Sequence, residues 1–222
     1  MTATRSNRIA QVLLIVMGFF VGIVLAIIVS KALLNDTSVL TKQQRKLDVD
    51  RAPVEYVRVP GIGRVAYQFL FEELSEPGES LDSFASRIGP RLRAYSDATE
   101  FEACGVIATD GKSFGVVVGS SHSHIACVNF SSIVPSGMVS TNETIHSHGV
   151  DSRFVANNND KVLQGQTFQG RAGIMSVNGQ KLDNFSAMDI QSGPGYLAAP
   201  NGLVLHQAGK IGTTRVVSRV VP

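Results

Sequence analysis

The sequence predicts a mixed α/β (α+β) domain, with a mostly antiparallel sheet and packed helices, behind one N-terminal transmembrane helix. Two observations carry this prediction. An uncharged apolar stretch lies near the N-terminus, and one amphipathic helical pattern is followed by a series of short strand-like runs. We expect an anchor over residues 1–34, a polar linker or stalk over residues 35–52 and the domain over residues 53–222.

The predicted anchor is Ile9–Val29, which reads IAQVLLIVMGFFVGIVLAIIV and contains no charged residue. A helix of roughly 20 apolar residues spans the ~30 Å hydrocarbon core of a bilayer. A cleaved signal peptide would have a shorter apolar core that ends at a small-x-small site, and Ser30-Lys31-Ala32 matches such a site poorly. The sequence therefore favours a retained signal-anchor.

Flanking charges do not decide the orientation of this anchor. Arg5 and Arg8 precede it, but Lys31 and further basic residues lie after it. Long domains translocate largely regardless of such charges, and N-terminal anchors with a short basic head usually export the domain behind them. We therefore expect the domain on the periplasmic or exterior side.

Composition excludes several function classes. The formal net charge is only +2, there is no Trp, and aromatic residues make up 7% of the chain, so we expect no nucleic-acid partner. The two cysteines, Cys104 and Cys127, exclude both a disulfide scaffold and a zinc site built mainly from thiolates. They are compatible with one disulfide or with two buried thiols, and the sequence leaves both open.

The helical pattern begins after Ser80, which can serve as the N-cap. Apolar residues then recur at three- and four-residue spacings, which predicts a helix with one face toward the core. Pro90 lies inside this pattern and should kink or split the helix. The apolar positions of the stripe are Leu81, Phe84, Ile88, Leu92 and Tyr95.

Short runs with strand-like composition surround this helix. The polar stretch Asp151–Gly170 predicts a loop that overhangs another part of the domain. The expected strands are Val54–Pro60, Arg64–Phe71, Cys104–Ala108, Phe114–Val118, Ile125–Phe130, Thr144–His148, Gly173–Val177, Gly202–Leu205 and Thr214–Val221.

Five polar residues form a pattern suited to metal-dependent hydrolysis. His146 and His148 are two residues apart, so in an extended segment both imidazoles point to the same side. Catalytic zinc takes three protein ligands, and Asp189 could supply the third. Glu102 could act as the general base for a zinc-activated water, and Ser186 could donate a hydrogen bond to a developing oxyanion.

These residues also carry a resemblance to a known family. Glu102-Ala103-Cys104-Gly105, then His146-Ser147-His148, then Ser186-Ala187-Met188-Asp189 resemble the signature of JAB/JAMM metallopeptidases. The likeness covers residues 80–205. The chain also resembles the JAB-like domains at the C-termini of bacterial Rhs-type and other polymorphic toxins, which share a turn like Tyr196–Gly202.

The resemblance implies a curved sheet with packed helices and a Zn²⁺ cofactor. It implies that His146, His148 and Asp189 ligate zinc, that Glu102 is the general base and that Ser186 assists at the oxyanion. The chain departs from the family pattern in two ways. Gly149 stands where a proline often follows the second histidine, and the stretch 149–185 before the Ser-x-x-Asp motif is far longer than usual.

Other interpretations of the same residues stay open. Glu100 would share a strand face with Glu102, and only the resemblance prefers Glu102. His122 and His124 form a second His-x-His motif, which we interpret as a solvated pair in a hairpin. Ser186 with Asp189 three residues later also fits the start of a helix, an interpretation that is compatible with a catalytic one.

The sequence thus predicts a membrane-anchored, zinc-dependent hydrolase of peptide or isopeptide bonds, placed as a single-pass protein in a bacterial inner membrane. Its expected partners are the membrane, through the Ile9–Val29 helix, a peptide or protein substrate and an envelope protein complex. One alternative is a catalytically silent JAB-like binding or assembly module of an envelope or secretion complex. A toxin-like effector is the other alternative.

Overall fold

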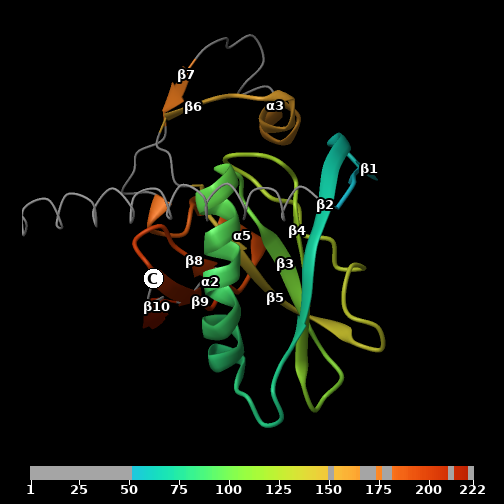
Figure 1. The fold of residues 1–222 in the computed structure, drawn as a ribbon, viewed down its shortest axis with the longest axis vertical. Helices are drawn as coiled ribbons and strands as arrows, with labels where there is room; N and C mark the ends of the chain where they lie inside the picture. Colours follow the sequence, from blue (N-terminus) through green and yellow to red (C-terminus); the bar gives the residue numbers. More distant parts are fainter. Residues whose placement is uncertain (1–51, 150–152, 166–173, 177–181, 210–212, 220–222) are drawn as a thin grey trace, which may run out of the picture. The chain divides into compact units, whose positions relative to one another are not determined.

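A mostly antiparallel sheet organises the chain in the computed structural model, which describes residues 52–149, 153–165, 174–176, 182–209 and 213–219 (Figure 1). Its strand order is β1-β2-β4-β3-β5-β8-β9-β10, and every neighbouring pair is antiparallel except β5 and β8. The predicted mixed α/β class with a mostly antiparallel sheet is confirmed. The strands are β1 (Val54–Val59), β2 (Gly63–Leu74), β3 (Cys104–Thr109), β4 (Phe114–Ser120), β5 (Val139–Ser147), β8 (Gly195–Ala198), β9 (Leu203–Gln207) and β10 (Thr214–Arg219).

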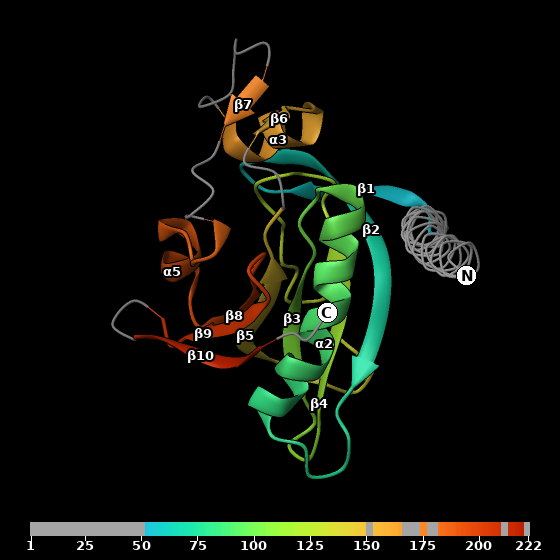
Figure 2. The same cartoon turned by 60° about the vertical axis from the view of Figure 1, so that its left-hand side comes forward.

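Helix α2 (Leu81–Thr99) lies along one face of this sheet and packs on β5 and β8 (Figures 1 and 2). The Ser80 hydroxyl accepts a hydrogen bond from the backbone N–H of Ser83, as expected for an N-cap. Pro90 lies within the helix without dividing it into two elements, so the expectation of a split is wrong. Packing against the sheet compensates for the backbone hydrogen bond that the proline cannot make.

The core lies between α2 and the sheet. The predicted apolar stripe supplies Phe84, Ile88 and Leu92, which are fully buried against strand residues such as Ile145. Gly89 lets the helix approach the sheet closely, because a Cβ atom there would lie 2.9 Å from the Val204 side chain. The helix is therefore held close to the strands that carry the candidate site.

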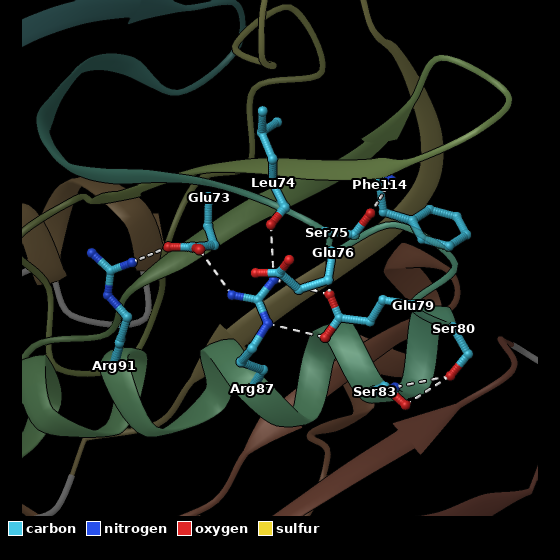
Figure 3. Close-up of polar contacts among 10 residues, drawn as sticks. All are labelled: Glu73, Leu74, Ser75, Glu76, Glu79, Ser80, Ser83, Arg87, Arg91 and Phe114. Atoms are coloured by element: carbon cyan, nitrogen blue, oxygen red, sulfur yellow. Dashed lines mark hydrogen bonds and ion pairs between the residues drawn. The ribbon is translucent and has the colours of Figure 1, made fainter.

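An ion-pair network also connects α2 to β2 (Figure 3). The Arg87 guanidinium donates hydrogen bonds to Glu79, to Glu73 and to the backbone carbonyl of Leu74. Arg91 also pairs with Glu73. These groups lie at the surface or are half-buried, and their role is to hold the helix against the end of the strand.

Two local expectations are wrong. Ile125–Phe130 is not a strand; the segment has no regular secondary structure, and it runs alongside the candidate site. The described part of Asp151–Gly170 is not a plain loop, because it contains β6 (Arg153–Val155) and the helix α3 (Asn158–Gln164). Strand β6 pairs with β7 (Ile174–Ser176) in a separate two-stranded sheet.

The predicted anchor Ile9–Val29 and the linker up to residue 51 lie outside the described residues. Among the residues that are described, no helix is long and apolar enough to cross a membrane.

Candidate metal centre

Three of the predicted residues meet in space. His146 Nε2 lies 3.2 Å from His148 Nε2 and 3.5 Å from Asp189 Oδ1, and His148 Nε2 lies 3.5 Å from Asp189 Oδ2. One candidate ligand atom from each residue lies within 4.8 Å of the others. Both histidines are buried and Asp189 is half-buried, so the cluster is largely shielded from solvent.

The cluster lies on the side of the sheet away from α2. His146 belongs to β5 and His148 comes just after the last residue of that strand, while Asp189 lies on α5 (Ala187–Ser192). Side chains alternate along a strand, so Ser147 points the opposite way and its hydroxyl lies 2.7 Å from the Ser96 hydroxyl of α2. Figure 2 shows α5 beside β8 and β9, on the other side of the strands from α2.

The tautomer of His148 is set by its contacts. Its Nδ1 lies 2.8 Å from the backbone carbonyl of Leu182, and a carbonyl can only accept. Nδ1 therefore carries a proton, and Nε2 is the ring nitrogen that faces His146 and Asp189 and could ligate a metal ion. Metal-ligating histidines are typically held in this way, with the other ring nitrogen donating to a carbonyl or carboxylate.

The charges of the cluster attract a cation. Burial raises the pKa of Asp189, but hydrogen bonds from His146 and His148 lower it more, so its net pKa lies well below the usual value. Burial lowers the pKa of His148, but the hydrogen bond with Asp189 and the charges of Glu102 and Asp189 raise it more. An ionised Asp189 beside two imidazoles favours a cation, and metal binding there would displace any proton that the cluster holds.

The donor set fits a zinc ion. Two imidazole nitrogens and one carboxylate are a common ligand set for catalytic zinc. With metal–ligand distances of about 2.0–2.2 Å, tetrahedral geometry places ligand atoms about 3.3–3.6 Å apart. Two of the three separations, both 3.5 Å, fall in that range, and the third, 3.2 Å, lies just below it.

Glu102 lies beside this cluster, in the short segment before β3. Its side chain is buried and faces the same cavity as the histidines. Burial raises its pKa to about 8; the charges of Asp189 and Asp160 also raise it, while those of His148 and Arg93 lower it. None of the described residues donates a hydrogen bond to its carboxyl group, so this group is available for proton transfer.

Glu100, the alternative considered from the sequence, is separated from the site by its conformation. It is the C-cap of α2 and adopts a left-handed backbone conformation with φ of 68°. Its side chain is exposed, and Glu100 does not line the cavity. The segment between α2 and β3 is not a strand, so residues two apart do not share a face there.

Ser186 lies at the rim of the cavity and is the N-cap of α5. Its hydroxyl accepts a hydrogen bond from the backbone N–H of Asp189, and the Asp189 carboxylate accepts one from the backbone N–H of Ser186. This capping box fixes Asp189 in its position beside the histidines. The Ser186 hydroxyl proton is still available to a bound ligand, because the cap uses only the oxygen as an acceptor.

The cavity has a volume of about 460 Å³. Its walls include α5 with Phe185 before it, and the irregular segment that contains Ile125 and Cys127. Cys127 forms a disulfide with Cys104, the first residue of β3, and Cys104 pairs in register with His146. The disulfide, which the sequence left open, thus joins the wall of the cavity to the strand beside the metal cluster.

Gly149, the residue after His148, lies where the chain is crowded. A Cβ atom at this position would lie 2.8 Å from the backbone carbonyl oxygen of Glu100 and 3.0 Å from that of His124. The chain leaving His148 therefore passes too close to two other segments for any side chain to fit without a shift.

The second His-x-His motif does not join the cluster, and the expectation that it is solvated is wrong. His122 Nε2 lies 2.8 Å from the side-chain oxygen of Gln68. His124 Nδ1 lies 2.8 Å from Asp160 Oδ2, and its ring lies between those of Phe101 and Phe154. Both rings are half-buried structural groups that join the segment after β4 to its neighbours.

Arg93 is a site residue that the sequence did not reveal. Its guanidinium is buried under the His146–Ser147–His148 motif and donates to the backbone carbonyl of His148. The one sequence feature that could have drawn attention to Arg93 is its place directly after Leu92, which belongs to the predicted buried face of the helix. The acceptor is a backbone carbonyl, which every residue has, so no pattern of side chains identifies the contact.

Comparisons with known proteins add no relative. No family model matches the chain, and no similar curated protein or solved structure was found.

Proposed function

We propose that the chain is a membrane-anchored, zinc-dependent hydrolase of peptide or isopeptide bonds with a JAB/JAMM-like domain. The observation that carries this proposal is the meeting of His146, His148 and Asp189 at one cavity that Glu102 also lines. These residues come from separate segments, and a purely structural role does not require all four to face one cavity. The resemblance noted in the sequence assigns the same residues to zinc binding and proton transfer.

Each residue has a role that its position supports. His146, His148 and Asp189 would hold the ion, which when bound supplies Lewis acidity and lowers the pKa of water to near neutrality. Without a metal the pKa of Glu102 is about 8, and the charge of a bound cation nearby would lower it. The ionised carboxylate would then take a proton from the attacking water and pass it to the leaving nitrogen. The Ser186 hydroxyl donates a hydrogen bond to the oxygen that gains negative charge.

The lining of the cavity bears on the substrate. Ile125, Leu182, Phe185 and Met188 supply apolar surface. We infer that the residue next to the cleaved bond is apolar, because these side chains would contact it.

Zinc content of the full-length protein in detergent tests the metal site. We expect about one zinc per chain, and its loss in the His146→Ala/His148→Ala double variant. His206→Ala is the matched control, because His206 pairs with Glu143 outside the cavity and its loss should leave zinc content unchanged. A folded wild-type protein that takes up no zinc, even when zinc is supplied, would refute the proposal and favour the non-catalytic module.

Activity on peptides with apolar residues tests the hydrolase role. Glu102→Gln should keep its zinc and lose turnover by about 100-fold or more, because general acid–base catalysis contributes about 10²–10⁴-fold. Glu100→Gln changes an exposed carboxylate two residues away and should cleave normally. Equal turnover by Glu102→Gln and wild type would exclude Glu102 as the base.

A further inference from the structure

Arg93 of α2 carries a buried positive charge under the candidate metal centre. Its side chain is one of the few charged groups in the core, at 5% exposure. Nη1 donates to the backbone carbonyl of His148 at 2.7 Å and to that of Ala198 at 3.3 Å. Nε and Nη2 donate to Asp97 Oδ1 at 3.0 and 2.9 Å.

The two carbonyls lie where the sheet ends. Strand β5 stops at Ser147, which pairs with Ala198 at the end of β8, so His148 lies beyond the ladder of backbone hydrogen bonds. The Arg93 guanidinium bridges the carbonyls of His148 and Ala198 and thereby continues the pairing by one residue. The imidazole of His148 reaches the carbonyl of Leu182 through Nδ1, a contact that depends on where the backbone of His148 lies.

A second contact from α2 supports the same motif. The Ser96 hydroxyl lies 2.7 Å from the Ser147 hydroxyl, which also accepts a hydrogen bond from the backbone N–H of Ala103. Arg93, through the His148 carbonyl, and Ser96, through the Ser147 side chain, thus hold the His-Ser-His motif from one side of the sheet. The imidazoles face the candidate metal site on the other side.

Packing alone does not explain why a charged residue, Arg93, is buried at this position instead of an apolar one. Burial of a guanidinium is costly unless its N–H groups are satisfied, and replacing a buried ion pair by apolar residues of similar volume is often neutral or stabilising. What an apolar side chain cannot do is donate hydrogen bonds to the two carbonyls. The charge is therefore explained by the backbone that it holds in place.

We propose that Arg93 is a positioning residue for the zinc ligand His148, an inference that rests on the proposed zinc-dependent function. Arg93 sets the backbone of His148, and so the direction in which Nε2 points toward His146 and Asp189. It touches neither the candidate metal position nor the substrate. Its planar guanidinium meets two carbonyls and a carboxylate at once, which the single ammonium group of a lysine cannot reproduce.

Zinc affinity of full-length variants in detergent tests this role. Arg93→Met should bind zinc about 10–100-fold more weakly than wild type, the loss that is typical when the groups that orient a metal ligand are removed. Arg93→Lys should lie between, at about a tenfold loss. Arg87→Met is the matched control, since Arg87 lies on the same helix and its ion pairs with Glu73 and Glu79 hold β2 instead (Figure 3).

The control separates positioning from general stability. Arg87→Met should lower the unfolding temperature and leave the zinc Kd of the folded protein unchanged. A folded Arg93→Met that binds zinc as tightly as wild type would overturn the proposal. If Arg93→Met does not fold, Arg93→Lys decides, and wild-type affinity in that variant overturns the proposal as well.

An NMR measurement on the metal-free protein tests the positioning role of Arg93 separately from the proposed zinc-dependent function. Failure of the wild-type protein to bind zinc would refute the zinc-dependent function. The Nδ1 proton of His148, which is bonded to the Leu182 carbonyl, should then still give a slowly exchanging NMR signal. Arg93→Met should lose this signal and Arg87→Met should retain it; retention in both variants refutes the positioning role.

Discussion

At the scale of single residues, the difference between Glu100 and Glu102 is one of burial and backbone conformation. Glu100 ends α2 in a left-handed conformation and its side chain is exposed, whereas Glu102 is buried beside His148. The charge of a carboxylate is costly to bury, and burial is the largest cause of the raised pKa of Glu102. The residue that is proposed to move protons therefore also has a measurable effect on stability.

We expect the stability of the zinc-free protein to fall with rising pH because of Glu102. Its pKa is about 8 in the folded protein and near 4.5 in the unfolded chain, so between these values only the folded state keeps the proton. Stability contributed by that proton is complete below about pH 4.5 and is lost as the pH rises to about 8. Each unit of difference between the folded and unfolded pKa values changes the free energy of unfolding by about 1.4 kcal/mol.

Glu102→Gln removes this dependence, because glutamine does not titrate. The variant should gain stability relative to wild type as the pH rises from 5 to 8, measured by denaturant unfolding in the presence of a chelator. The same comparison with Glu100→Gln should show no such gain. Parallel stability profiles for wild type and Glu102→Gln would mean that Glu102 is ionised in the folded protein at pH 5.

At the scale of secondary-structure elements, the polar stretch 149–185 before the Ser-x-x-Asp motif contains a strand and a helix that its composition did not predict. Helix α3 begins with a capping box between Asn157 and Asp160. The Asp160 carboxylate is fully buried and also accepts hydrogen bonds from the Ser123 hydroxyl, the backbone N–H of His124 and the His124 ring. A single acidic residue therefore joins α3 to the segment that continues into the wall of the cavity.

Asp160→Ala should release α3 from this segment. The variant leaves several buried donors without an acceptor, which costs about 3 kcal/mol or more of unfolding free energy. Hydrogen exchange followed by mass spectrometry should show faster exchange over residues 121–126 and 157–165. Asp110→Ala is the control, because Asp110 accepts backbone hydrogen bonds in an exposed turn elsewhere. Unchanged exchange in Asp160→Ala would show that α3 is held by other contacts.

At the scale of the whole molecule, the disulfide bears on where the domain resides. The bridge joins Cys104 at the start of β3 to Cys127 in the cavity wall. Disulfides persist in oxidising compartments and are rare where thiols are kept reduced. The bridge therefore favours an oxidising compartment for the domain, as expected for the exterior side of the membrane.

Thiol labelling in intact cells tests this placement. We expect Cys104 and Cys127 to resist alkylation in unreduced samples and to react after reduction and denaturation. Protease added to spheroplasts should digest the domain, while a cytoplasmic marker protein stays intact. Free thiols together with a protected domain would place it on the cytoplasmic side and contradict the expected orientation.

Much of the architecture is encoded in local patterns that the sequence displays directly. The apolar spacing from Leu81 to Tyr95 and the cap at Ser80 locate α2, because helix periodicity and capping involve only residues within a few positions of one another. The same holds for most strands. Residue types, order and spacing, together with a family resemblance, also predict the candidate site residues His146, His148, Asp189, Glu102 and Ser186.

Contacts between residues that are far apart in the sequence could be identified only from the tertiary structure. The approach of Asp189 to the two histidines depends on how α5 packs beside β8 and β9, where Gln207 donates hydrogen bonds to the backbone of Asp189 and Gly193. The Cys104–Cys127 bridge and the order in α3 likewise depend on contacts across the domain. Arg93 acts on backbone carbonyls, which are the same at every position, so only the tertiary arrangement distinguishes the carbonyl that it binds.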